Sequence, residues 1–158
     1  MSGIIIYTFH NSHPYFFVQI VKHSLSNNTH VWKVEDFGGS KDFLETPYHT
    51  AVREFVEETN GEFRLTTTSS VDEIRNILRK NSHQYILING RYYLFLCYVP
   101  TEFMTQIDCE RFGNMEKTDE LERYCVWLSL NQFKRYIRQG SCHPRLSKQF
   151  YTWLKSTF

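Results

Sequence analysis

The chain has no apolar run that approaches the roughly 20 residues a helix needs to cross a bilayer. Its first residues, MSGIIIYTFHNSH, have too short an apolar stretch and no basic flank for a secretory signal peptide. The four cysteines are widely spaced and form no C-x-x-C pair, which argues against a zinc site and against a disulfide framework. We therefore expect a cytoplasmic protein in a reducing environment, with no membrane partner.

Acidic residues are missing from both ends of the sequence. All 17 lie between Glu35 and Glu122, and the formal net charge is +1. The basic residues after position 123 are Lys134, Arg135, Arg138, Arg145, Lys148 and Lys155. A basic end beside an acidic site would suit a polyanionic substrate. The alternative, that these residues are the solvated faces of two amphipathic helices, is the commoner origin of such a pattern and stays open.

Length and periodicity predict one domain over residues 1–158, with 41% hydrophobic residues to form its core. The predicted strands cover residues 3–9, 15–23, 31–37, 62–67, 83–88, 91–99 and 123–128. The predicted helices cover 47–59, 70–80, 129–140 and the segment from 144 onward, and capping boxes begin the second and third. Asn89-Gly90 predicts a hairpin turn, and residues 101–119 a long loop. This pattern alone indicates an α/β or α+β fold.

The segment of residues 39–61 reads GSKDFLETPYHTAVREFVEETNG and contains an acidic cluster. Glu54, Glu57 and Glu58 are spaced i, i+3 and i+4, which places their carboxylates on one helix face. Like charges at this spacing repel, and a hard divalent cation would reverse that cost by taking carboxylate oxygens as ligands. The alternative is a solvated acidic helix face.

This segment resembles the signature of Nudix hydrolases, G-x5-E-x7-R-E-U-x-E-E-x-G-U, in which U is a bulky aliphatic residue. Gly39 and Glu45 match the first two fixed positions, and Arg53-Glu54 and Glu57-Glu58 match the acidic part. Only the end departs: Asn60 replaces the glycine and Gly61 the last apolar residue. Asn tolerates left-handed backbone best among residues other than glycine, so a helix stop at this point is physically equivalent.

The resemblance implies a Nudix-type α/β/α sandwich with a mixed sheet and a division of roles within the motif. Glu54, Glu57 and Glu58 would hold Mg²⁺ or Mn²⁺, together with the backbone carbonyl of Gly39. Arg53 and Glu45 would form the pair that orients the helix against its loop. Independently, Arg53 lies four residues before Glu57 and can neutralise the cluster along the helix. Thr46 and Pro47 suit the N-cap and the first helical position.

The activity implied is metal-dependent hydrolysis of the diphosphate linkage in a nucleoside-diphosphate-X compound, with Arg53, Glu54, Glu57 and Glu58 as the catalytic residues. Such hydrolysis uses a general base within hydrogen-bond reach of the attacking water. Glu58 and Glu54 are candidates for that base. Other candidates are the acids of the 101–119 loop and its flank, namely Glu116, Asp119, Glu120 and Glu122.

The substrate is left open by the sequence. Between Gly61 and Gln84 there is neither the proline of ADP-ribose hydrolases nor the tyrosine of dinucleoside polyphosphate hydrolases. Capped RNA and diphosphoinositol polyphosphates are alternatives that the basic C-terminal end favours slightly. Aromatic residues that could stack a base, although core is their commoner role, are Phe16, Phe17, Trp32, Tyr92 and Tyr93. A homodimer is also open, and a non-catalytic Nudix-fold binding module is the rival from another functional class.

Overall fold

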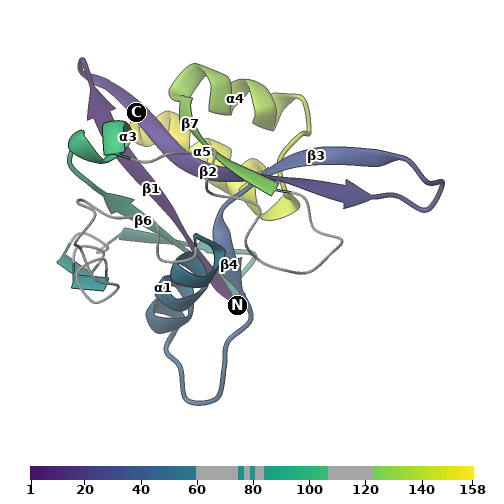
Figure 1. Cartoon of the computed structure of the whole chain (residues 1–158), viewed down its shortest axis with the longest axis horizontal. Coiled ribbons are helices and arrows are strands. Elements are labelled where there is room, and N and C mark those ends of the chain that lie inside the picture. Colours follow the sequence, from purple (N-terminus) through teal and green to yellow (C-terminus); the bar gives the residue numbers. More distant parts are fainter. Residues whose placement is uncertain (60–74, 77–78, 81–83, 107–122) are drawn as a thin grey trace.

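The computed structural model describes residues 1–59, 75–76, 79–80, 84–106 and 123–158. Its strands are β1 (Ser2–His10), β2 (His13–Ser24), β3 (His30–Glu35), β4 (Phe37–Gly39), β5 (Gln84–Ile88), β6 (Tyr92–Tyr98) and β7 (Arg123–Ser129). They form one seven-stranded sheet in which β3, β2, β1, β6 and β5 follow one another, β4 pairs with β1, and β7 pairs with β2 (Figure 1). The sheet is mixed, because β6 is parallel to β1 whereas the other pairs are antiparallel.

The two longest strands, β1 and β2, pair with each other over only part of their length, and this arrangement shapes the site. β1 pairs with β2 from Ile6 to His10, and its first residues pair instead with β4. Similarly, β2 pairs with β1 only as far as Phe17, and its second half pairs with β3. The chain therefore pairs with β2 through β3 and with β1 through β4. Asp36 is the residue at the crossing between these two strands.

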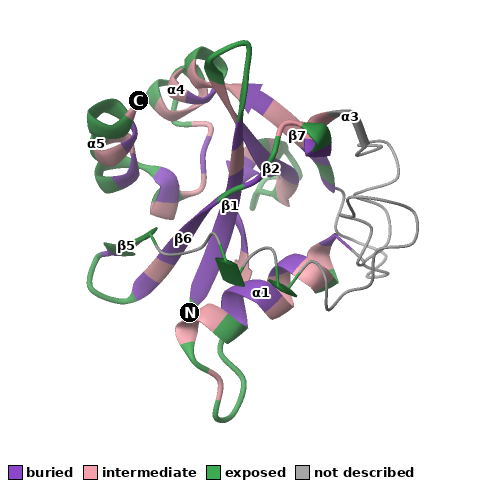
Figure 2. Cartoon of the chain, turned by 90° about the vertical axis from the view of Figure 1, so that its left-hand side faces the viewer, coloured by how far each residue is buried: buried purple, intermediate pink, exposed green. Residues whose placement is uncertain are grey.

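Helices cover both faces of the sheet, which makes the α/β/α sandwich with a mixed sheet that the family resemblance implies. They are α1 (Pro47–Glu58), α3 (Glu102–Gln106), α4 (Leu130–Arg138), the 3₁₀ turn η1 (Pro144–Leu146) and α5 (Lys148–Thr157). On one face Phe55 of α1 packs with Ile4, Ile6 and Phe17. Alternate residues of the same strands point to the other face, as the two-residue period of a strand requires. The buried side of α1 and the buried strands are visible in Figure 2.

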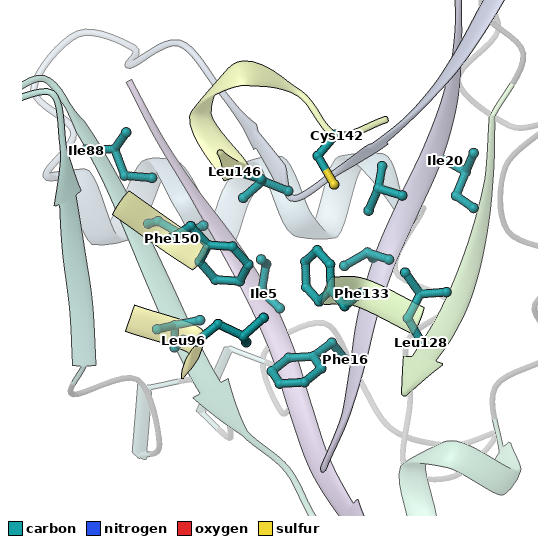
Figure 3. Close-up of a cluster of buried hydrophobic side chains, with 14 of the residues drawn as sticks. Ile5, Phe16, Ile20, Ile88, Leu96, Leu128, Phe133, Cys142, Leu146 and Phe150 are labelled. Atoms are coloured by element: carbon teal, nitrogen blue, oxygen red, sulfur yellow. The ribbon is translucent and has the colours of Figure 1, made fainter. Parts of the chain in front are cut away.

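The second face holds a larger apolar cluster, shown in Figure 3. Phe133 of α4 and Phe150 of α5 lie over Ile5 and Phe16, and all four side chains are fully buried. Leu146 of η1 is buried in the same cluster. The helices α4 and α5 therefore lie on the side of the sheet opposite α1.

Most predicted elements are confirmed with small changes at their ends. The hairpin turn at Asn89-Gly90 is present with φ angles of 51° and 66°, and the capping box of Ser129 and Gln132 begins α4. The predicted strand 31–37 is divided into β3 and β4, and the predicted last helix into η1 and α5. The predicted loop 101–119 is wrong at its start, where α3 forms. The predicted strand 62–67 and most of helix 70–80 lie outside the described residues.

No helix in the described part of the chain is long and apolar enough to cross a membrane.

Candidate active site

The loop that leads into α1 is fixed at both ends by short-range contacts. β4 carries Gly38 and Gly39 into the loop, and α1 begins at Pro47. Thr46 is the N-cap, as the sequence predicts: its Oγ1 accepts a hydrogen bond from the backbone N–H of His49 at 3.2 Å. The helix ends at Glu58, with Thr59 as C-cap. The predicted stop at Asn60 and Gly61 lies outside the described residues.

Arg53 and Glu45 form the predicted ion pair across this loop. The Arg53 Nε donates to Glu45 Oε1 at 2.8 Å, and Nη2 is 3.2 Å from Oε2. Nη2 also donates to the carbonyl oxygen of Ser40 at 2.8 Å, so one guanidinium connects both arms of the loop to the helix. Hydrogen bonding to Arg53 lowers the pKa of Glu45 to about 2.

Arg53 also neutralises the acidic cluster, as its spacing predicts. Its Nη1 donates to Glu57 Oε2 at 3.0 Å and lies 3.1 Å from Glu54 Oε1. The Glu57 side chain keeps 51% of its surface exposed, whereas Glu54 keeps 15%. Burial raises the pKa of Glu54 despite the nearby guanidinium.

Glu58 points to a different set of partners, in the interior. Its Oε2 accepts from the backbone N–H of Gly38 at 3.0 Å and from Gln19 Nε2 at 3.1 Å. Its Oε1 lies 3.3 Å from Arg123 Nη1. Burial raises the pKa of Glu58 to about 8, against the opposing effects of Arg123 and Gln19. Gln19 and Arg123 thus belong to the site.

The structure places the Gly39 backbone next to the Glu54 carboxylate, because a Cβ at position 39 would lie 2.5 Å from Glu54 Cδ. In the side-chain conformations present, no group of three or more His, Cys, Asp or Glu side chains forms a metal-binding set within the described residues. The donor chemistry nevertheless fits a hard cation, since it consists of carboxylate oxygens and a backbone carbonyl. Glu54 and Glu58 fit best, because burial raises the pKa of both and a bound cation would offset that cost. Glu57 would have to turn away from Arg53 to join them.

Sequence reasoning missed the residues that hold Glu58, although two of them carried a signal. Gln19 is the one polar residue in the apolar run FFVQIV, and Arg123 begins a strand. Both residues are buried, with 2% and 5% of their surface exposed. A lone polar residue inside an apolar strand needs a partner, and here the partner is the motif carboxylate. The candidate bases Glu116, Asp119, Glu120 and Glu122 lie outside the described residues.

The aromatic residues proposed for base stacking are mostly part of the core. Phe16 and Phe17 are fully buried and Tyr92 is 7% exposed, so none of the three offers a free face. Trp32 is 41% exposed, but it packs beside Tyr124, its ring 5.7 Å from that ring. Its register with Lys22 puts it on the face of the sheet opposite α1. The stacking role is therefore wrong for Phe16, Phe17 and Tyr92.

The basic C-terminal end is not beside the acidic motif. Arg135 and Arg138 are exposed on α4, across the sheet from α1, and Arg145 is largely buried. For α4 the solvated helix face is thus the better interpretation.

A cavity of about 630 Å³ opens on the flank of α1, on the side of His49 and Arg53, away from Glu58. Its lining residues are Glu45, Tyr48, His49, Val52, Arg53, Arg75, Asn76 and Arg79.

Comparisons with known proteins give structural neighbours only. No protein-family model matches the chain, and no curated protein matches it significantly. An Ap4A hydrolase from C. elegans, in a binary complex, is similar over 98% of this chain and 92% of its own, with 13% identity and a TM-score of 0.48. A mutT/nudix family protein from Listeria innocua is similar over 99% and 88%, with 16% identity and a TM-score of 0.43. A Nudix hydrolase from M. Smegmatis, RenU, covers 99% and 86%, with 13% identity and a TM-score of 0.41. At these values the assignment of function depends on the residues of the site.

Proposed function

We propose that this chain is a divalent-metal-dependent Nudix pyrophosphohydrolase that cleaves the diphosphate linkage of a nucleoside-diphosphate-X substrate. One observation carries the proposal: two largely buried carboxylates of α1, Glu54 and Glu58, lie against the backbone of a glycine pair. Glu54 contacts Gly39, and Glu58 accepts from the N–H of Gly38. Burying carboxylates in this way costs free energy unless their charge is compensated, which is what a metal site provides.

Glu54 and Glu58, with Glu57 and the Gly39 carbonyl, would hold Mg²⁺ or Mn²⁺. Bound there, the ion would screen the diphosphate and lower the pKa of a water molecule. Arg53 keeps the loop closed onto α1 and donates a hydrogen bond to Glu57. We assign the base to Glu54 or Glu58, whose pKa values are both raised by burial. Glu45, with a pKa of about 2, is a poor base and keeps its structural role.

The basic residues of the C-terminal end give no support to a long polyanion as the substrate. A capped RNA or a diphosphoinositol polyphosphate would draw on a basic surface next to the metal site. Arg135 and Arg138 lie on the opposite face of the sheet from α1, and Arg145 is paired with acidic residues. These residues therefore do not provide that surface.

The test is phosphate-ester release with Mg²⁺ or Mn²⁺ from a panel of substrates: ADP-ribose, NADH, dinucleoside polyphosphates, dNTPs, capped RNA and a diphosphoinositol polyphosphate. Mn²⁺ binding is measured in parallel by electron paramagnetic resonance. We expect turnover of a nucleoside-diphosphate compound that Glu57→Gln and Glu54→Gln abolish. The matched control is Glu102→Gln, an exposed acid of α3. Ligand binding without turnover in the wild type would instead identify a binding module.

A further inference from the structure

A buried ionic network lies at the crossing between β3 and β4. Arg145 Nε donates to Asp36 Oδ1 at 2.5 Å, and the Tyr92 hydroxyl donates to Asp36 Oδ2 at the same distance. The Arg145 guanidinium lies over the Tyr92 ring, 4.9 Å from its centroid. Asp36 is completely buried, and the Arg145 side chain is 15% exposed. The carboxylate thus has a partner on each oxygen.

The segment after α4 delivers Arg145 to this place by pairing with the edge of β3. The backbone N–H of Val34 donates to the carbonyl of Ser141, and the N–H of His143 donates to the carbonyl of Val34, each at 2.9 Å. Immediately after Arg145, Leu146 is buried in the second apolar cluster. The position of Arg145 is therefore fixed by the chain on both sides.

The network is connected to the candidate active site through Asp36. Its backbone carbonyl accepts from Gln19 Nε2 at 2.9 Å, and the same nitrogen donates to Glu58 Oε2 at 3.1 Å. Two residues after Asp36, the N–H of Gly38 donates to the same Glu58 oxygen at 3.0 Å. Both donors to this oxygen therefore depend on the placement of residues 36–38.

The network also packs directly against the glycine backbone. A Cβ at Gly38 would overlap the Tyr92 hydroxyl, and a Cβ at Gly3 would overlap both that hydroxyl and Asp36 Oδ2. The hydroxyl of Tyr92 therefore occupies the space that the two glycines leave, next to the backbone of Gly38.

Stability alone is a weak reason for such a network. A buried ion pair loses its hydration, and well-packed apolar residues in its place are often equally stable or more so. An ion pair with hydrogen bonds does, however, fix geometry more narrowly than apolar packing. This property is useful where a backbone N–H must point at a carboxylate.

We propose that Arg145, Asp36 and Tyr92 are positioning residues that hold Gly38 and Gln19 in place to orient Glu58, acting from the side of the sheet opposite α1. This inference rests on the proposed function insofar as Glu58 serves catalysis. The orientation of Glu58 can be measured without any turnover. An experiment can therefore contradict this inference without contradicting the proposed function, and the reverse.

The test uses Tyr92→Phe, which removes only the hydroxyl, and Arg145→Met, which keeps the aliphatic stem. Loss of a supporting hydrogen bond around a metal site typically lowers activity about 10- to 100-fold, and we expect that loss in kcat with KM nearly unchanged. Arg145→Lys restores the charge without the planar fork and should recover part of kcat. Ser129→Ala is the control, because it removes the N-cap of α4 on the same side of the sheet and lowers stability without touching the network.

The second readout is the backbone amide of Gly38, followed by ¹H–¹⁵N nuclear magnetic resonance in metal-free protein. Glu58→Gln, which removes the charged acceptor, gives the reference shift. We expect the Gly38 signal to move in the same direction in Tyr92→Phe and Arg145→Met, and to stay in place in Ser129→Ala.

An unchanged Gly38 signal and unchanged kcat in Tyr92→Phe and Arg145→Met, at a stability loss like that of Ser129→Ala, would overturn the proposal. If Arg145→Met does not fold, Tyr92→Phe decides alone. If the wild type has no metal-dependent turnover, the proposed function fails and the Gly38 signal still decides whether the network orients Glu58.

Discussion

The carboxylate of Glu54 lies directly against the backbone of Gly39. A Cβ at position 39 would come within 2.7 Å of Glu54 Oε2, which is well inside van der Waals contact. The site therefore accepts only glycine at this position as long as Glu54 keeps its place. The overlapping atoms are the end of a flexible side chain, so a larger residue would displace the carboxylate before it disturbs the fold.

Gly39→Ala is accordingly expected to reduce turnover far more than stability. A displacement of about 1 Å at a catalytic group can cost about 100-fold in rate, and we expect a loss of that order in kcat/KM. Steady-state kinetics and thermal unfolding would measure the two effects. Ser40→Ala is the control, because Ser40 contributes its backbone carbonyl to Arg53. Equal losses in both variants would contradict the role of Gly39.

The Glu45–Arg53 pair should contribute stability that depends on pH in the acid range. The pKa of Glu45 is about 2 in the fold against an ordinary value of 4.5, so the folded protein binds this proton less readily than the unfolded chain. Its contribution is thus present above pH 4.5 and is lost as the pH falls towards 2. We expect Glu45→Gln to cost about 1 kcal/mol at neutral pH, since the pair is partly exposed and screened by solvent.

Urea unfolding between pH 2 and pH 6 would test this. The wild type and Glu45→Gln should differ at pH 6 and converge at the acid end. A constant difference across the range would show that the pair is not responsible.

Glu58 should give a pH dependence of opposite sign. Its pKa is about 8 in the fold against an ordinary 4.5, because the carboxyl is buried. Between these values the folded protein keeps a proton that the unfolded chain has released, so metal-free stability falls as the pH rises through this window. In Glu58→Gln this part of the slope should disappear. Thermal unfolding in the presence of a chelator, from pH 5 to pH 9, would measure it, with Glu102→Gln as control; parallel curves for wild type and Glu58→Gln would contradict it.

Removing the cap of α4 should separate stability from catalysis. The Ser129 hydroxyl accepts from the N–H of Gln132 at 3.3 Å, and loss of such a cap typically costs about 1 kcal/mol. Because α4 lies across the sheet from α1, we expect Ser129→Ala to lower the free energy of unfolding and leave kcat unchanged. Urea unfolding and kinetics on the same preparation would check this, and a fall in kcat would show coupling through the sheet.

Neutralising the basic side of α4 should not affect the proposed reaction. The variant has Gln in place of Lys134, Arg135 and Arg138. Its kcat/KM for a nucleotide substrate should equal that of the wild type at both low and high salt. Suitable concentrations are about 50 and about 200 mM, because contacts to phosphate weaken strongly over that range. A salt-sensitive RNA affinity that this variant loses would instead support a decapping activity.

The parts of the fold that the sequence predicts are those determined over a few residues. Thr46 and Pro47 begin α1 by local capping chemistry, and Asn89-Gly90 forms the two-residue turn that these two residues predict. The Glu45–Arg53 pair spans eight residues and follows from the family resemblance. The acidic residues of the motif are likewise on α1, as predicted.

The contacts that the sequence did not reveal join residues far apart in the chain. In the sequence, Arg145 looks like an ordinary solvated surface residue. It reaches Asp36 only because residues 141–143 pair with β3. Gln19 interrupts an apolar strand, but its partner could not be identified without knowing where α1 crosses β2. Strand pairing over such separations has no local signal in a single sequence.

Asp36 and Arg145 are 109 residues apart in the chain, and Gln19 and Arg123 are 104 apart. During synthesis the glycine turn and the α1 carboxylates therefore leave the ribosome well before the arginines that complete their surroundings. Closing loops of this length costs chain entropy that the later apolar contacts of η1 and α5 must offset. A nascent chain that has completed α1 would accordingly carry every carboxylate of the motif while still lacking Arg123, which lies beside Glu58, and Arg145, which pairs with Asp36.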